Sequence, residues 1–84
     1  MIVKTLKVNL ESGLHARPAA EFVRVASKFR SSVIVEYEGI SVNGKSIMGL
    51  LMLGLHPGAE IKVIINGDDE KEAFQSIQKL LKSG

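Results

Sequence analysis

Hydrophobic residues along the chain recur at two spacings, one typical of strands and the other typical of helices. Runs that alternate between apolar and polar positions, or that are rich in β-branched residues, are typical of half-buried strands. Such runs predict four strands, over residues 2–8, 33–37, 40–42 and 61–65. Glu38 and Gly39 separate the second run from the third, and this two-residue spacer predicts a hairpin.

Apolar residues spaced three and four positions apart predict helices, because residues at that spacing share one face of a helix. The pattern predicts helices from Ala16 to about Arg30, from Ser46 to Leu53, and after Asp69. Asp69 and Glu72, three residues apart, predict a capping box at the start of the last helix.

These elements follow the order β-α-β-β-α-β-α within a single domain, residues 1–84. A chain of this size buries only roughly 60% of its unfolded surface, so a two-layer core is the expected limit. Each helix has one apolar stripe to bury, which favours helices on one face of a sheet. Polar or mixed residues such as Lys7, Glu36 and Lys62 fit an opposite face that stays partly exposed. We therefore predict an α+β fold, a two-layer open-faced sandwich.

Composition excludes several classes of site. The chain has no cysteine, so neither disulfides nor thiolate zinc sites are expected, and we predict no metal and no cofactor. No apolar run reaches the roughly 18 residues of a membrane helix, and Met1–Lys4 lacks the layout of a signal peptide. We expect a cytoplasmic, monomeric protein with no membrane insertion.

The basic balance is weak evidence for nucleic-acid binding. The sequence pI is about 9.1, but the net charge is only +2 and the basic residues are spread along the chain. A nucleic-acid binder concentrates lysine and arginine and adds exposed aromatics, whereas Phe22, Phe29 and Phe74 fall at expected core positions. We predict no nucleic-acid partner. The alternative from another functional class is a basic RNA-binding domain, whose binding to RNA would weaken steeply as salt is added.

The candidate chemistry lies in the segment from Gly13 to Ala20, Gly-Leu-His-Ala-Arg-Pro-Ala-Ala. Pro18 suits the first turn of a helix, so His15 precedes a helix N-terminus, where unpaired N–H groups and the macrodipole favour an anion. Arg17 adds a guanidinium that can hold phosphate oxygens in a fork. A lone histidine before a helix is commonly a loop or capping residue, but the arginine favours a nucleophilic imidazole beside a phosphate-sized site.

The same segment resembles the active-site signature of HPr, the histidine-containing phosphocarrier family of the bacterial sugar phosphotransferase system. A second signature, Lys-Ser-Ile-Met-Gly from Lys45 to Gly49, extends the resemblance over essentially the whole chain. The resemblance implies a four-stranded antiparallel sheet in the order 1-4-2-3, with the helices on one face. Asn9 to Leu14 then forms the active loop.

The resemblance also implies a stoichiometric carrier rather than an enzyme. Neutral His15 would accept a phosphoryl group on Nδ1 from enzyme I, which is charged by phosphoenolpyruvate, and pass it to sugar-specific enzyme IIA domains. Arg17 would stabilise the phosphoryl group, only modestly, because a carrier must release what it holds. The alternative is an HPr-like regulatory binding module without phosphocarrier activity, which the presence of both His15 and Arg17 disfavours.

Ser46 precedes the predicted short helix, where a serine commonly caps the first-turn N–H groups without any further role. The resemblance to Gram-positive-type HPr proteins implies a second role, phosphorylation of Ser46 by an ATP-dependent HPr kinase. It further implies catabolite control protein A, a transcription regulator, as a partner of the phosphorylated form.

The short helix is more apolar than its inward face requires, and Leu50 and Leu53 are its better core candidates. The resemblance implies that an exposed apolar patch here docks partner proteins. We assign the docking residues as Ala20, Arg24, Ile47, Met48 and Leu51. Met52 is as well explained as a core residue that fills a gap.

Two further motifs invite other functions. Gly39 to Ser46 matches the P-loop pattern, but Ile40–Val42 has strand character where a phosphate cradle needs an open loop. The short chain also cannot build the parallel sheet that supports such loops. His56 lies in the turn sequence His-Pro-Gly without a ligand partner at metal spacing, so we expect a surface turn.

Overall fold

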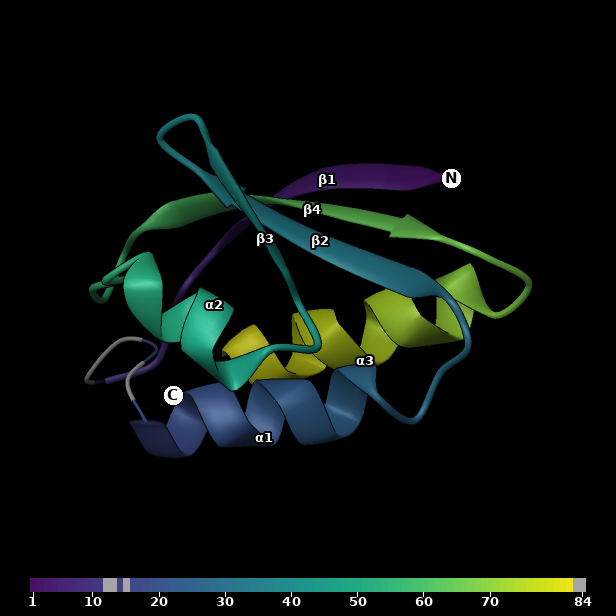
Figure 1. The fold of residues 1–84 in the computed structure, drawn as a ribbon, viewed down its shortest axis with the longest axis horizontal. Helices are drawn as coiled ribbons and strands as arrows, with labels where there is room; N and C mark the ends of the chain where they lie inside the picture. The colour runs from purple at the N-terminus through teal and green to yellow at the C-terminus, as the bar shows by residue number, and fades with distance from the viewer. Residues whose placement is uncertain (12–13, 15, 83–84) are drawn as a thin grey trace.

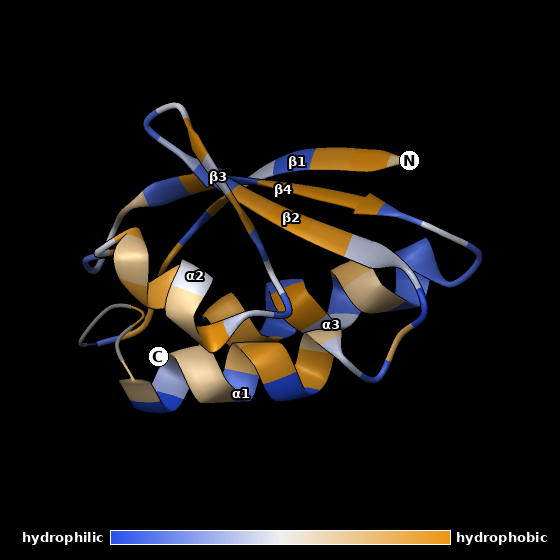
Figure 2. Ribbon diagram, viewed as in Figure 1, coloured by the Kyte–Doolittle hydropathy of each residue, from blue (hydrophilic) through white to orange (hydrophobic). Residues whose placement is uncertain are grey.

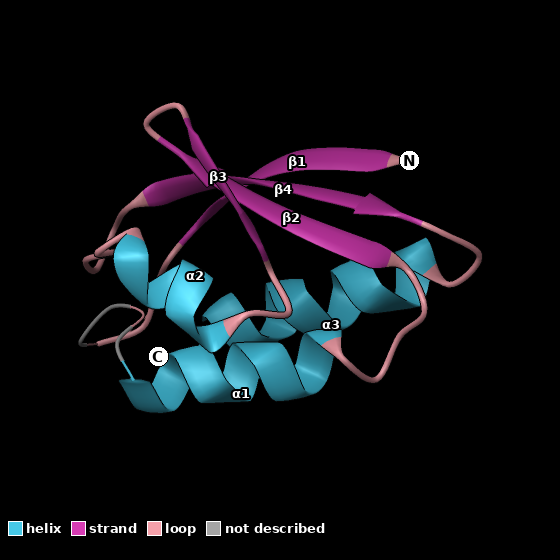
Figure 3. Ribbon diagram, in the orientation of Figure 1, coloured by secondary structure: helices cyan, strands magenta, loops and turns pink. Residues whose placement is uncertain are grey.

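The computed structural model describes residues 1–11, 14 and 16–82. Figure 3 shows the strands and helices within this part of the chain, and Figure 1 gives their labels. In chain order they are β1 (Ile2–Lys7), α1 (Ala16–Ala26), β2 (Ser32–Tyr37), β3 (Ile40–Asn43), α2 (Ile47–Met52), β4 (Glu60–Asn66) and α3 (Glu70–Lys82). The predicted order of elements is confirmed. None of the helices in this part of the chain has the length and hydropathy to cross a bilayer.

The four strands form one antiparallel sheet in the order β1-β4-β2-β3, as the resemblance implied. All three helices lie on the same side of it (Figure 1), so the open-faced sandwich is confirmed. Aligned residues share a face of a sheet, and one such row runs Thr5, Lys62, Glu36 and Ser41 across the four strands. This polar row lies on the face without helices.

The core lies between the sheet and the helices. Val33, Val35 and Val63 project from the central strands toward the helices and are almost fully buried. Phe22 of α1 and Ile77 of α3 are fully buried opposite them. The hydropathy colouring of Figure 2 shows the same division in α1, where orange residues lie on the side toward the sheet and blue residues on the side away from it.

The hairpin between β2 and β3 has the two-residue turn that the sequence predicted. Glu38 has φ 51° and Gly39 has φ 81°, so both central residues are left-handed. That geometry suits a type I′ turn, whose twist matches the flanking strands. Glycine accepts it readily, whereas Glu38 is the only non-glycine residue with positive φ in the described part of the chain.

The first helix ends earlier than predicted. α1 stops at Ala26 rather than near Arg30, and the tighter bonds Lys28 N–H to Val25 O and Phe29 N–H to Ala26 O follow it. These bonds reach back three residues, as in a 3₁₀ turn. The apolar spacing continues through the turn because Phe29 still packs against the core, although only partly buried.

The predicted capping box at Asp69 and Glu72 is wrong. The Asp69 carboxylate accepts hydrogen bonds from the Ser31 hydroxyl and from the N–H groups of Ser31 and Arg30. Glu70 instead reaches back to the N–H of Gly67, at 3.1 Å. Asp69 therefore joins the start of β2 to the start of α3, a tertiary contact that the local pattern could not reveal.

The structure also removes the P-loop reading. The middle of that motif is β3, paired with β2, and Gly44 donates its N–H to the Val33 carbonyl oxygen at 2.7 Å. The ammonium of Lys45 donates to the carbonyl oxygen of Phe29 at 2.8 Å. Lys45 thereby supplies a donor to a carbonyl of the turn that follows α1. Its ammonium is engaged by the fold and is not placed to bind a nucleotide phosphate.

Candidate functional site

The segment between α2 and β4 holds both ends of the active loop through backbone hydrogen bonds. At one end, Val8 donates its N–H to the Ala59 carbonyl at 2.8 Å and accepts at its own carbonyl from Gly58 at 2.7 Å. At the other end, Leu14 donates its N–H to the Leu55 carbonyl at 3.1 Å. Because backbone bonds between buried groups are costly to break, these contacts fix where the loop leaves and re-enters the fold.

Side chains reinforce the second of these anchor points. Leu14 is 2% exposed and Leu55 is 5% exposed, so both belong to the core. The next described residue, Ala16, is the first of α1. The predicted acceptor His15 lies outside the described residues, between an anchored leucine and a helix N-terminus.

Arg17 lies exposed in the first turn of α1, with no ion pair or hydrogen bond to another described residue. The first turn of α1 carries no acidic residue that would neutralise its N–H groups. A helix N-terminus and an uncommitted guanidinium both favour an anion. The start of α1 therefore offers an accessible, electropositive site beside residue 15.

The other arginine of the predicted site is differently placed. Arg24 donates to Glu21 at 2.8 Å, one turn away on the exposed face of α1. The hydrogen bond and the charge of Arg24 lower the pKa of Glu21, and Glu21 likewise raises the pKa of Arg24. Exposed pairs of this kind contribute little to stability. Arg24 is thus accessible to a partner, but to pair with a carboxylate of that partner it would have to give up its hydrogen bond to Glu21.

The exposed side of α2 is apolar, and we call its four residues the α2 patch. Ile47 is 41%, Met48 71%, Leu51 38% and Met52 76% exposed. Leu50 is fully buried and Leu53 is 8% exposed, so these two residues hold the helix to the core as predicted. α2 packs against α1, and Ala20 is exposed on α1. The predicted docking residues are thus all accessible on two neighbouring helices.

Ser46 is the N-cap of α2. Its backbone is extended, with φ −120° and ψ 116°, and its hydroxyl accepts the N–H of Gly49 at 3.1 Å. Gly49 suits the close approach of α2 to β3, since a Cβ at this position would lie 3.1 Å from the Cβ of Val42, tighter than an ordinary contact. Ser46 is half-buried, so the hydroxyl that caps the helix is also the group a kinase would have to reach.

His56 lies exposed in the turn between α2 and β4, as predicted. Its Nε2 is 3.2 Å from the Tyr37 hydroxyl and its Nδ1 is 2.9 Å from the Pro57 carbonyl oxygen. A neutral imidazole protonated on Nδ1 satisfies both contacts, with Tyr37 as the donor to Nε2. No group of three metal-binding side chains occurs in the described ranges.

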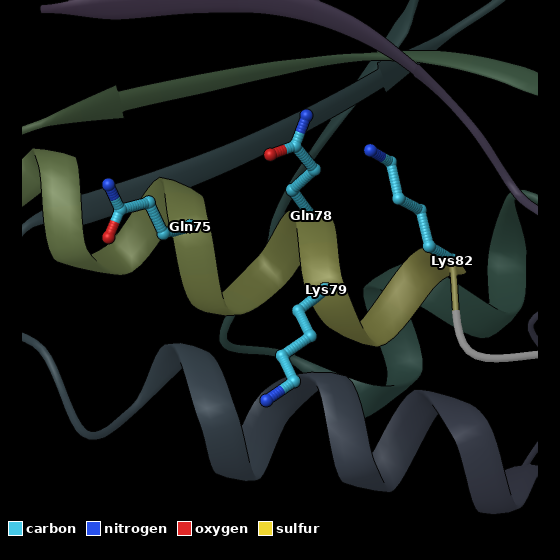
Figure 4. Close-up of a pocket in the computed structure, with 4 residues that line it drawn as sticks. All are labelled: Gln75, Gln78, Lys79 and Lys82. Carbon is cyan, nitrogen blue, oxygen red and sulfur yellow. The ribbon is translucent and has the colours of Figure 1, made fainter.

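Two shallow hollows lie away from the start of α1. Gln75, Gln78, Lys79 and Lys82 line one of about 390 Å³, and Figure 4 shows that a single helix, α3, supplies all four. The other, of about 290 Å³, lies between α1 and α3 and includes Arg24 and Lys79. Neither includes Arg17 or a residue of the α2 patch, so the predicted chemistry belongs to an open surface.

Sequence reasoning left Met52 undecided and did not identify the anchoring segment. Met52 is exposed, and the signal was present, because Leu50 and Leu53 already fill the inward face of so short a helix. The anchors carried no such signal, because they are backbone groups and any residue has them.

Comparisons with known proteins agree with this arrangement. A family profile described as "PTS HPr component phosphorylation site" matches residues 2–83. The HPr-like protein Crh of Bacillus subtilis is 46% identical over 77 residues, 92% of this chain and 91% of that protein. The phosphocarrier protein HPr of Treponema pallidum is 40% identical over 83 residues, 99% of this chain and 94% of that one.

Two crystal structures from Thermoanaerobacter tengcongensis are also similar. They are HPr-C-His, with a TM-score of 0.94, and an HPr dimer, with a TM-score of 0.78. Both are 46% identical to this chain and cover 99% of it, and the chain covers 93% and 95% of them respectively.

Proposed function

Because this chain belongs to the HPr family of the phosphotransferase system, we propose that it carries a phosphoryl group on His15 between two proteins. The donor is enzyme I, charged by phosphoenolpyruvate, and the acceptors are sugar-specific enzyme IIA domains. The protein acts as a stoichiometric carrier in the cytoplasm. The observation that carries the proposal is the exposed, unpaired Arg17 at the N-terminus of the helix that His15 precedes.

The transfer forms one bond and breaks one bond at each step. The Nδ1 lone pair of neutral His15 attacks phosphorus, the bond from phosphorus to enzyme I breaks, and the phosphoryl group becomes a phosphohistidine. Arg17 and the α1 N–H groups offset its negative charge. Because this stabilisation is exposed to solvent it stays modest, which suits a group that must be released to the next protein.

Partner docking is assigned to the α2 patch together with Ala20 and Arg24. Exposed apolar side chains beside a polar rim are typical of protein–protein contact sites, and flexible methionine suits a surface that must accept several partners. Arg24 is the charged member of this set and lies on α1, against which α2 packs; a charge at the edge of an interface affects association rates more than affinity. No small-molecule pocket is required, since the phosphoryl group arrives on another protein.

Ser46 is proposed as a regulatory phosphorylation site for an HPr kinase, with catabolite control protein A as the partner of the modified form. A phosphate at the start of α2 would add about 1.5 to 2 negative charges next to Ile47 and Met48. This charge should hinder docking at an apolar patch and favour a partner that presents arginines. Incubation with HPr kinase and ATP should add one phosphoryl group to the parent protein and none to Ser46→Ala.

A regulatory HPr-like module without carrier activity is the second candidate, since the HPr-like protein Crh is a similarly close relative. The two candidates differ in whether His15 is labelled.

We further propose that the carrier works as a monomer, because the α2 patch and Arg17 are accessible in a single chain. Light scattering after gel filtration distinguishes this state from a dimer such as the one formed by the T. tengcongensis relative.

The decisive experiment is incubation with enzyme I and phosphoenolpyruvate, followed by intact-mass measurement. The parent protein should gain one acid-labile phosphoryl group and transfer it to an enzyme IIA domain, whereas His15→Ala should gain none. His56→Ala is the matched control, because it removes the chain's other histidine from an exposed turn and should label fully. Labelling of His15→Ala, or failure of the parent to label, would overturn the proposal.

A further inference from the structure

We propose that Met48 and Met52 are a modification site at which peroxide switches off partner docking. Oxidation of their thioethers to sulfoxides makes the α2 patch polar and lowers the rate of phosphoryl transfer. The inference rests on the proposed function, because the loss is expected in docking to enzyme I. It adds a chemical control that is separate from Ser46.

Accessibility is the first requirement, and both sulfur-bearing side chains meet it. Met48 is 71% exposed and Met52 is 76% exposed, well above Leu51 at 38% on the same helix. They stand four residues apart, so they are neighbours on one face of α2. Oxidation of either residue therefore changes the same stretch of surface.

The chemistry is a two-electron oxidation that needs only a peroxide. The thioether sulfur attacks one peroxide oxygen, the O–O bond breaks, an S–O bond forms, and the other oxygen leaves as water after taking up a proton. The sulfur is oxidised and the peroxide is reduced, so atoms and electrons balance. A thiol-dependent methionine sulfoxide reductase restores the thioether, which makes the change reversible.

The physical effect falls on binding rather than on folding. A sulfoxide is polar and must lose bound water when an apolar partner surface covers it, so docking becomes less favourable. The fold is insulated because α2 is anchored by Leu50, fully buried, and Leu53, 8% exposed. Neither of the exposed methionines belongs to the buried core.

The chain carries its own internal control. Met1, the third methionine, is 73% exposed, so peroxide should oxidise it as well. It lies at the opposite end of the molecule from α2 (Figure 1), where its amino group is bound to Glu70 at 3.0 Å. If peroxide acts on docking through the α2 patch, the docking defect after peroxide treatment must disappear when only Met48 and Met52 are replaced.

The test compares the parent with a Met48→Leu, Met52→Leu double variant, before and after hydrogen peroxide, with peptide mass spectrometry to locate the sulfoxides. The readout is the initial rate of His15 labelling by enzyme I and phosphoenolpyruvate, at carrier concentrations below saturation. The oxidised parent should label more slowly by roughly fivefold or more, which is the loss expected when one interface contact is weakened. Its labelling rate should recover after treatment with sulfoxide reductase and dithiothreitol. The double variant, whatever its starting rate, should label equally fast before and after peroxide, although its Met1 is oxidised.

The outcomes separate the inference from the function it rests on. If the parent labels equally fast before oxidation and after oxidation, with both sulfoxides present, the inference is overturned and the carrier function stands. Equal slowing of the double variant also overturns it, because the effect then comes from elsewhere. A parent that never labels overturns the carrier function, and the proposed control falls with it.

Discussion

The N–H of Leu14 donates a hydrogen bond to the carbonyl oxygen of Leu55, 3.1 Å away, although the two residues are far apart in the sequence. Both side chains are almost fully buried. The residue immediately after Leu14 in the sequence is the proposed phosphoryl acceptor, so this bond fixes the backbone at the residue before it. The same segment holds the start of the active loop through Val8.

Leu14→Ala is expected to reduce the free energy of unfolding by about 2–5 kcal/mol, because it removes most of a buried side chain and leaves a cavity. Urea denaturation at neutral pH measures the change. Ile40→Ala is the matched control, since Ile40 is 55% exposed on β3 and should lose less than about 1 kcal/mol. Similar losses in the two variants would show that Leu14 does not anchor the active loop through burial.

Arg17→Lys should slow phosphoryl transfer while leaving docking to enzyme I intact. Lysine keeps the charge but loses the planar fork that can hold two phosphate oxygens. Single-turnover labelling measures the transfer step, and calorimetric titration with enzyme I measures docking. Unchanged transfer kinetics would remove Arg17 from the mechanism.

Met48→Asp should weaken docking without unfolding the protein, because it places a charge in the α2 patch at a position that is 71% exposed. Leu50→Asp should instead unfold the domain, since the carboxylate would be buried where Leu50 is fully enclosed. Circular dichroism melts and affinity for enzyme I separate the two cases. A Met48→Asp protein that is unfolded would mean that this side chain supports the core.

Substitutions at Ser46 should separate its capping role from its regulatory role. Ser46→Ala loses the hydrogen bond to Gly49 and should cost about 1 kcal/mol of stability. Ser46→Asp keeps a cap and should preserve thermal stability, yet slow transfer from enzyme I because it adds charge beside the α2 patch. If Ser46→Asp transfers as fast as the parent and HPr kinase leaves the parent unmodified, the residue is only a cap.

Asp69 should make stability depend on pH in the acid range. The Ser31 hydroxyl, followed by the Arg30 N–H, holds the pKa of the Asp69 carboxyl below its ordinary value of 3.8. A lowered folded-state pKa stabilises the fold above the unfolded value, and the contribution is lost as the pH falls through the lowered pKa. Asp69→Asn should thus have a lower free energy of unfolding than the parent at pH 7, and this difference in stability should shrink near about pH 2.

Urea midpoints at both pH values measure that difference. Asp68→Asn is the control, because Asp68 is exposed and accepts no hydrogen bond from the described residues. The urea midpoint of Asp68→Asn should differ little from that of the parent. A difference for Asp69→Asn that stays constant with pH would mean that its carboxylate charge contributes nothing to folding.

Periodicity, β-branched content and turn residues predicted the elements, because each strand and helix buries one face and the apolar residues record that face. The strand order came from the family resemblance, since pairing between distant strands leaves no local pattern. The end of α1 was misplaced because Phe29 continues the helical spacing while packing from a turn. The capping box failed for a related reason: Asp69 has a better partner in Ser31, from a distant part of the chain.

The candidate site was predictable where side-chain chemistry defines it and not where the backbone does. His15, Arg17 and Ser46 became candidates through residue type and position near a predicted helix start, and the family resemblance implied their roles. Met52 was left open, because an apolar residue in a short helix suits either a core or a docking surface. Its exposure was already favoured by Leu50 and Leu53, which the sequence assigned to the interior and which are buried there.

The polar row that crosses the uncovered face of the sheet gives this protein a convenient attachment point. Thr5 is exposed in that row, on the side opposite all three helices, and the chain contains no cysteine. In Thr5→Cys the introduced thiol would be unique, so a maleimide dye or a sensor-chip linker could be joined at one defined position. Immobilised in this way, the molecule would present α1 and α2 to solution, and partner exchange could be followed in real time on an unobstructed surface.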